Sequence, residues 1–234
     1  MKTYPMFTVL EGKECLVVGG GAVGERKVAD LLAAGAKVTV VSPTITPGLA
    51  KRAARGEIRC LAEDFAPRHL MGMALVLGAT DDPRVNAQVS AAAQDLGIWV
   101  NIADAPELCT FIVPARVSRG DLTVAVSTGG ASPALARKLR EEMEGRFGRE
   151  YGPYLALLKR VRERLLAVRR GHRDNPARFR RLVDSPLLEA LARRNREQTR
   201  RLLTDILGPA LGPDVVAALV EEAFKDLEAL ATGA

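Results

Sequence analysis

The sequence predicts an α/β protein in three parts: a parallel-sheet domain over residues 1–113, a small α+β segment over 114–150 and an all-helical domain over 151–234. Three observations support this division. Short β-branched runs alternate with helical patterns through most of the first part, which is typical of a parallel sheet with crossover helices. Two strand-like runs then flank a tight turn, as in a hairpin. In the third part, apolar residues recur at helical spacing.

A glycine-rich turn follows the first predicted strand, which covers residues 14–18. Its G-x-G-x-x-G spacing is the fingerprint of dinucleotide-binding domains of the Rossmann type. The first glycine makes the turn, the second lets backbone approach a pyrophosphate, and the third lets the helix pack close to the sheet. The helix that follows offers free N–H groups and a partial positive charge to phosphates. The cofactor-binding residues predicted here are Gly19, Gly21, Ala22, Val23 and Gly24.

The remaining elements of the first two parts follow from local signals. Thr46, Asp82 and Ser132 each precede a proline, so each is expected to cap a helix that begins at that proline. Glycines are expected to end the helices. The predicted strands that follow the first one are 37–41, 57–61, 74–79, 98–102, 115–118 and 122–126.

The carboxyl ends of parallel strands meet at one edge of a sheet, where ligands of such folds bind. We therefore expect four turns to form one crevice, and the nicotinamide cofactor NAD to bind in it. The second strand ends without the Asp or Glu that usually holds the ribose, and without an Arg suited to a 2′-phosphate, so NAD is favoured over NADP. The predicted cofactor-binding residues outside the glycine turn are Ser42, Pro43, Thr44, Thr80, Asp81 and Asn101.

Asp104 is the candidate catalytic residue, because it directly follows the fifth strand on the expected cofactor side. A carboxylate in this place is suited to accept a proton while the cofactor accepts a hydride. Position alone leaves a second role open, in which Asp104 caps the short turn at 105–107.

Composition limits the class of protein. The chain has 234 residues, of which 47% are hydrophobic and 26% charged, which is typical of a globular protein. It contains no apolar run long enough for a membrane span, and its N-terminus lacks the core of a signal peptide. We therefore predict a cytoplasmic protein that does not bind membranes.

The cysteines and histidines predict no preformed metal site. Cys15, Cys60 and Cys109 are an odd number and lack metal-type spacing, so they are expected to be reduced thiols. His69 lies in a linking segment and is expected to be structural or solvated. His172 lies in a charged break between helices, where a metal role is not expected.

Basic residues are concentrated in one segment. Residues 151–202 carry 15 basic and 5 acidic groups, whereas residues 203–234 carry 1 and 6. Such a block attracts nucleic acid or a ligand with many negative charges. The alternative is a solvated face of surface helices, and the sequence alone leaves the choice open.

The α+β segment predicts dimerisation. Its hairpin is followed by a helix on which Leu135, Leu139 and Met143 recur every four residues. A hairpin and one amphipathic helix make too small a core to stand alone. A second copy of the chain is the expected partner.

Several stretches together resemble one family, that of the precorrin-2 dehydrogenases and sirohydrochlorin ferrochelatases of siroheme synthesis. The resemblance extends in order over residues 4–145 and is much more specific than the glycine fingerprint. The stretches that carry it are Tyr4–Phe7, Val17–Lys27, Ala79–Asp82 with Asn86, Asn101–Pro106, Phe111–Ala115, and Val124–Pro133 with Ala136 and Arg137.

The resemblance implies an enzyme that oxidises precorrin-2 to sirohydrochlorin with NAD, in siroheme or cobalamin biosynthesis. Some members also insert ferrous iron, and members are homodimers with the active site at the subunit junction. The family's catalytic aspartate corresponds to Asp104, and its substrate-binding turn corresponds to Ser127, Thr128 and Gly129. Some members have Ser at the position of Thr128.

Two other functions remain as alternatives. A regulator that senses NAD(H) would use the basic helical segment to contact nucleic acid, but that segment shows no clear helix-turn-helix and no interleaved aromatic residues. Binding of nucleic acid is therefore not expected. A chelatase without redox chemistry would not need an intact glycine fingerprint.

Overall fold

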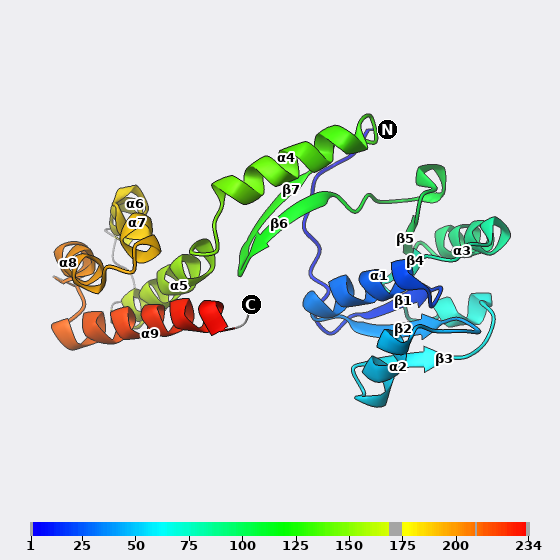
Figure 1. Ribbon diagram of the computed structural model, residues 1–234, viewed down its shortest axis with the longest axis horizontal. Coiled ribbons are helices and arrows are strands. Elements are labelled where there is room, and N and C mark those ends of the chain that lie inside the picture. The colour runs from blue at the N-terminus through cyan, green and yellow to red at the C-terminus, as the bar shows by residue number, and fades with distance from the viewer. Residues whose placement is uncertain (1, 169–174, 209, 233–234) are drawn as a thin grey trace. The chain divides into compact units, whose positions relative to one another are not determined.

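The computed structural model describes residues 2–168, 175–208 and 210–232. The chain divides into two compact units, one of residues 1–113 and one of residues 114–234 (Figure 1). Each unit is described separately below.

The first unit is built on a five-stranded sheet in which all neighbouring strands are parallel. The strand order is β3-β2-β1-β4-β5, so the chain turns from one half of the sheet to the other between β1 and β4 (Figure 1). The predicted α/β class with a parallel sheet is confirmed. The strands are β1 (Glu14–Val18), β2 (Lys37–Val41), β3 (Ile58–Leu61), β4 (Leu75–Gly78) and β5 (Trp99–Ile102).

Helices cover both faces of this sheet. Successive side chains of β1 enter opposite apolar clusters: Cys15 and Val17 pack with α1 and α2, whereas Leu16 and Val18 pack with α3 and η1. This two-sided burial explains why the strands read as continuous apolar runs. The elements are α1 (Ala22–Ala33), α2 (Pro47–Ala54), α3 (Pro83–Asp95) and two short 3₁₀ helices, η1 (Pro67–Leu70) and η2 (Pro106–Leu108).

The three predicted N-caps are confirmed. The side chain of Thr46 accepts a hydrogen bond from the third residue after it at 3.2 Å, and Ser132 does the same at 3.2 Å. Asp82 accepts from the N–H of Arg84 at 2.8 Å. Each cap satisfies a backbone donor that a helix start leaves without an intrahelical partner.

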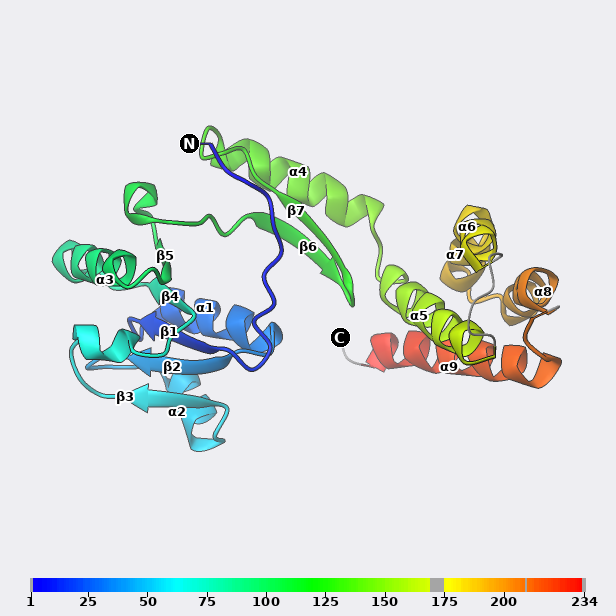
Figure 2. The same ribbon diagram turned by 180° about the vertical axis from the view of Figure 1, so that it is seen from behind.

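The second unit begins with an antiparallel hairpin of β6 (Ala115–Arg119) and β7 (Leu122–Val126). Helix α4 (Pro133–Arg146) packs against this hairpin (Figures 1 and 2). No residue of α4 is buried within the chain.

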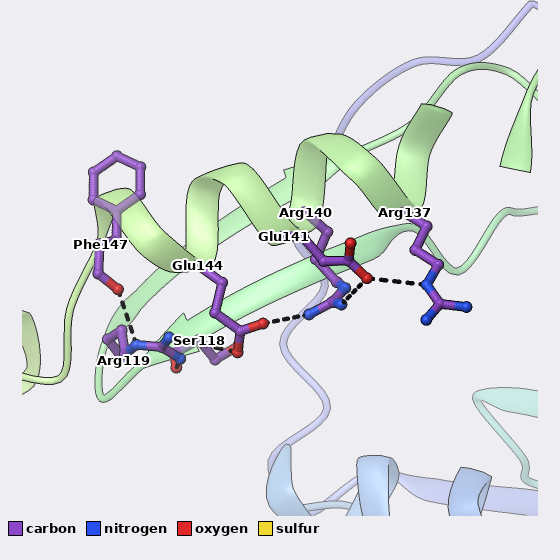
Figure 3. Close-up of polar contacts among 7 residues, drawn as sticks. All are labelled: Ser118, Arg119, Arg137, Arg140, Glu141, Glu144 and Phe147. Atoms are coloured by element: carbon purple, nitrogen blue, oxygen red, sulfur yellow. Dashed lines mark hydrogen bonds and ion pairs between the residues drawn. The ribbon is translucent and has the colours of Figure 1, made fainter. Parts of the chain in front are cut away.

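Charged side chains connect the hairpin to α4 (Figure 3). Arg119, the most buried of them, donates to the carbonyl of Phe147 at 3.0 Å and lies 3.6 Å from a carboxylate oxygen of Glu144. Glu144 also pairs with Arg140, which contacts Glu141 in turn. Most of these groups are exposed, so each pair contributes little, and Arg119 is the one anchored to backbone.

The described part of residues 151–234 contains five helices, and the predicted all-helical character of this segment is confirmed. Helices α5 and α9 lie side by side in both views, and α8 packs against α9 (Figures 1 and 2). They enclose an apolar core that includes Leu157, Leu203 and Leu219. The helices are α5 (Tyr151–Val168), α6 (Asn175–Asp184), α7 (Leu187–Ala192), α8 (Arg196–Leu207) and α9 (Pro213–Thr232).

Among the helices in the described ranges, none combines the length and the apolar character needed to cross a bilayer. The separation of residues 114–150 from 151–234 as two domains stays a prediction.

Candidate active site at the carboxyl edge of the sheet

The glycines of the fingerprint have different surroundings. A Cβ on Gly19, which has φ +116°, would lie 2.4 Å from the carbonyl oxygen of Ala79. A Cβ on Gly24 would lie 2.1 Å from the carbonyl oxygen of Gly19. Both glycines therefore allow backbone to approach backbone where β1, β4 and α1 meet.

Gly21 differs, because a Cβ added there would meet nothing within 4 Å. It is the N-cap of α1, with φ −80°, and no side chain caps this helix start. Gly21, Ala22 and Val23 are all exposed. The start of α1 is thus an open main-chain surface with a partial positive charge, and a diphosphate fits the chemistry of such a surface.

The turn after β2 lies against the glycine turn. A Cβ on Gly20 would lie 2.2 Å from the carbonyl oxygen of Thr44, and the N–H of Thr46 donates to the carbonyl of Gly20 at 3.0 Å. Ser42 is half-buried, while Pro43 and Thr44 are exposed. The structure therefore brings the predicted ribose-side residues next to the predicted phosphate-side residues.

Glu25 is a residue that the sequence reasoning did not single out. It lies in the first turn of α1, where its carboxylate accepts a hydrogen bond from the Thr46 hydroxyl at 2.5 Å. A Cβ on Gly48 would overlap this carboxylate, so α2 begins in direct contact with Glu25. The acidic group beside the open helix start is thus engaged by α2.

The turn after β4 is held by internal hydrogen bonds. The Thr80 hydroxyl accepts from the N–H of Asp82 at 3.0 Å, and the Thr80 carbonyl accepts from the amide of Asn86 at 2.9 Å. Asp81 is exposed. The Arg84 side chain, and then its backbone N–H, hold the pKa of the Asp82 carboxyl below its usual value.

Asp104 lies just beyond β5, with φ +57° and an exposed side chain. A positive φ is uncommon for a residue with a side chain, although Asp tolerates it better than most. The N–H of Ala103 donates to the carbonyl of Gly78 at 2.9 Å, which places this turn next to the end of β4. The N-cap of η2 is Ala105, so Asp104 does not occupy that cap position.

The segment after Asp104 is fastened to β5. The Asn101 amide donates to the carbonyl of Phe111 at 3.0 Å, so the amide of this predicted cofactor-binding side chain has a partner in the segment that follows η2. The Cys109 sulfur accepts from the N–H of Ile102 at 3.1 Å and lies 3.2 Å from the carbonyl oxygen of Ala105. These contacts close the loop that presents Asp104.

Lys27 adds a positive charge that the sequence reasoning also missed. It is half-buried on α1, one turn beyond the glycine turn. Burial lowers the pKa of its ammonium group, while Asp30, Cys109 and Asp104 act to raise it. The position of Lys27 in the fingerprint helix did not indicate that Cys109 and Asp104 would lie near it. Their effect on Lys27 depends on where the loop after β5 lies relative to α1.

No group of three or more potential metal ligands occurs within the described ranges. His69 is buried: its Nδ1 accepts from the N–H of Ala66 at 3.1 Å, and its Nε2 lies 3.1 Å from Glu63. His69 is therefore structural. His172 lies outside the described residues.

In the second unit, the predicted substrate turn is shaped by its own hydroxyl groups. The Thr128 hydroxyl accepts from the N–H of Ser132 at 3.2 Å, and the Ser127 hydroxyl accepts from the N–H of Gly129 at 3.2 Å. Gly129 and Gly130 have φ of +62° and +85°. The hydroxyl of Thr128 thus has a structural partner within the turn.

The basic segment is partly neutralised by α9. Arg160 lies 2.7 Å from Asp226, and Arg196 lies 2.6 Å from Glu221. Arg196 also stacks over the ring of Phe224, at 4.7 Å from its centroid. The positive surplus that the described helices present together is therefore smaller than the count for residues 151–202 indicates.

Comparisons with known proteins agree with this architecture. Residues 6–115 match the family model described as "Putative NAD(P)-binding", and residues 119–146 match the one described as "Sirohaem biosynthesis protein central". A siroheme synthase of Methylobacillus flagellatus is 53% identical over 163 residues, and siroheme synthase 1 of Aeromonas salmonicida is 39% identical over 213 residues. These alignments cover 70% and 91% of this chain but only 35% and 46% of the relatives.

One solved structure, "SirC, precorrin-2 dehydrogenase", is similar over most of both chains. It aligns with a TM-score of 0.70 and 27% identity, covering 87% of this chain and 98% of that one. The chain belongs to the siroheme synthase family and corresponds to its NAD(P)-binding and central parts.

Proposed function

We propose that this chain oxidises precorrin-2 to sirohydrochlorin with NAD. The observation that carries the proposal is the likeness to SirC, a precorrin-2 dehydrogenase, across 98% of that chain. The open main-chain surface at Gly21 supports it independently, because a chain that had lost dinucleotide binding would have no need of this surface. Bound NAD would supply the hydride acceptor.

In the proposed cofactor site, main-chain groups bind the diphosphate, and side chains contact the parts of NAD on either side of it. Gly19 to Gly24 would receive the diphosphate at the start of α1, and the turns at Ser42–Thr44 and Thr80–Asp81 would lie on either side. The turn after β2 offers hydroxyl groups and no carboxylate to the ribose. The lack of an arginine within Ser42–Thr44 favours NAD over NADP.

Asp104 is the proposed general base. Its exposed carboxylate follows β5, and the neighbouring Ala103 is hydrogen-bonded to the end of β4. Oxidation of precorrin-2 transfers a hydride to NAD and releases a proton, and Asp104 would accept that proton. A positioned base of this kind contributes about 10²–10⁴-fold to a rate.

We also propose how precorrin-2 binds and that the protein is a homodimer. Precorrin-2 carries many carboxylates, which the turn at Ser127, Thr128 and Gly129 and the basic helices would help to bind. We also propose a homodimer, since α4 has no buried residue and its Leu135 is 47% exposed in the single chain.

We also propose insertion of ferrous iron as a second reaction, in which iron is a substrate. The macrocycle nitrogens would be its ligands, and Asp104 would take up the displaced protons. A cytoplasmic location completes the proposal, because the cysteines of the chain are free thiols.

The decisive experiment gives the purified chain precorrin-2 and NAD without oxygen. Absorbance of sirohydrochlorin and of NADH should rise together in a one-to-one ratio. Sirohydrochlorin with ferrous iron, with and without NAD, is assayed separately for siroheme. Formation of siroheme without any NAD-dependent oxidation would reject the dehydrogenase and favour a chelatase.

A further inference from the structure

Asn86 is a buried polar residue of the first unit that the proposed chemistry does not use. It lies in the first turns of α3 and is 8% exposed. Its Nδ2 donates to the backbone carbonyl of Thr80 at 2.9 Å. Its Oδ1 is buried and has no hydrogen-bond partner among the described residues.

The carbonyl that Asn86 holds belongs to the turn facing the glycine fingerprint. The N–H of Ala79, one residue earlier, donates to the carbonyl of Val18 at 2.7 Å. The carbonyl of Ala79 is so close to Gly19 that no side chain fits there. Asn86 therefore helps to hold the residues after β4 in the shape that brings them against the glycine turn.

Packing alone does not explain an asparagine at this position. The buried face of α3 also contains Val89, Ser90 and Ala93, and an apolar residue would avoid leaving a buried acceptor without a donor. Gly78 is the neighbour that leaves room for the amide. A Cβ on Gly78 would lie 3.2 Å from Asn86 Oδ1 and 2.4 Å from a side-chain carbon of Ile102.

We propose that Asn86 is a positioning residue for the dinucleotide, acting through the carbonyl of Thr80 to hold the turn of residues 79–82 in a shape that receives the cofactor. This inference rests on the proposed function and adds a residue to its binding site. In this proposal Asn86 does not contact the cofactor. The arrangement consists of the Asn86 amide, the Thr80 carbonyl that it binds, and the space left by Gly78.

The test compares Asn86→Ala and Asn86→Asp with Thr199→Ala. Asp has nearly the shape of Asn but has no amide donor for the Thr80 carbonyl. Thr199 is the matched control, because it is fully buried in α8 and its hydroxyl donates to the carbonyl of Asn195 at 2.9 Å.

Three measurements are made on the full chain. NADH affinity is measured by the fluorescence of bound NADH, and hydrogen exchange of residues 79–82 is followed without cofactor. The KM values for NAD and precorrin-2 are then compared. We expect Asn86→Ala and Asn86→Asp to raise the NADH Kd by about tenfold, which is the effect of one buried hydrogen bond. The KM for precorrin-2 should stay unchanged.

Exchange of the 79–82 amides should be faster in both Asn86 variants and unchanged in Thr199→Ala. Because two Asn86 variants are compared, the inference remains testable if one of them fails to fold. An NADH Kd within twofold of the wild-type value in the folded Asn86 variants would overturn the inference. Failure of the wild-type chain to bind NADH would instead overturn the proposed function.

Discussion

The hydroxyl of Thr46 donates a 2.5 Å hydrogen bond to Oε2 of Glu25, joining the first turn of α2 to the first turn of α1. The same hydroxyl accepts from the N–H of Leu49 as the cap of α2. One oxygen thus caps a helix and fixes the turn after β2 against the glycine turn.

Replacing Thr46 should therefore destabilise the first unit. Thr46→Val removes the cap and the bond to Glu25, and we expect the free energy of unfolding to fall by about 2 kcal/mol. Urea unfolding followed by circular dichroism measures the change. Thr46→Ser keeps the hydroxyl and should retain most of the wild-type free energy of unfolding. Thr8→Val, at an exposed position, serves as a control. Equal loss in the Val and Ser variants would show that the hydroxyl is not responsible.

Two glycines of the fingerprint should respond differently to the same substitution. Gly24→Ala places a methyl group 2.1 Å from the Gly19 carbonyl oxygen, and we expect a loss of about 3 kcal/mol of stability. Gly21→Ala meets nothing within 4 Å, so it should lower stability by less than about 1 kcal/mol, the cost of Ala in place of Gly at an N-cap, while weakening NADH binding. Urea unfolding and NADH titration separate the two effects. Unchanged NADH affinity in Gly21→Asp, which carries a larger and charged side chain, would contradict the proposed diphosphate position.

Replacing Asp104 should lower the rate of precorrin-2 oxidation without lowering the stability of the protein. Asp104→Gly relieves a positive φ and should keep stability or raise it by up to about 1 kcal/mol. Formation of sirohydrochlorin should nevertheless fall by about 10²–10⁴-fold, and equally in Asp104→Asn, which tolerates the same backbone but is not a base. Single-turnover absorbance measurements test this. Turnover within threefold of wild type in Asp104→Asn would remove the carboxylate from the mechanism.

Ionisation of the Cys15 thiol should lower the free energy of unfolding as the pH rises into the alkaline range. Burial, and then the charge of Glu14, raise its pKa from 9.0 to about 11. The unfolded chain therefore releases this proton first, so the stabilising contribution is complete below pH 9 and is lost as pH rises towards 11. Urea unfolding of wild type and Cys15→Ala between pH 8 and 11 should show the two stabilities converging. Parallel profiles would contradict the prediction.

Leu135 should report on the proposed dimer. Because it is 47% exposed in the single chain, Leu135→Glu should leave the fold intact and convert dimer to monomer if the helix face is covered by a second copy. Light scattering after gel filtration measures this, with Lys138→Glu on the same helix as the control. NADH binding should persist, because the glycine turn lies in the other unit. A monomeric wild-type chain would reject the dimer.

Local signals in the sequence were sufficient for most of the fold. Caps such as Thr46 and Asp82 act within three residues, so their Ser/Thr/Asp-Pro pattern identifies the helix starts directly. The predicted strands at 57–61 and 74–79 are each slightly longer than β3 and β4, because strand ends depend on pairing with a neighbour.

The site was less accessible to sequence reasoning. Asp104 and the glycine turn were proposed from their places after strands, but no local pattern indicated that Glu25 would contact Thr46. The sequence also did not indicate that the Asn101 amide would donate to the Phe111 carbonyl, ten residues further along, and its part in cofactor binding stays a prediction. Such contacts join residues on different elements, and only the assembled sheet determines them.

The proposed diphosphate surface at Gly19 and Gly21 consists of main-chain atoms, and this has a thermodynamic consequence for binding. Main chain fixed by a sheet and a helix has no rotamers to lose when a ligand arrives, so association there pays little conformational entropy. The affinity of this surface for a diphosphate should consequently depend little on side-chain motion as the temperature changes. Binding should need no preceding rearrangement of the protein.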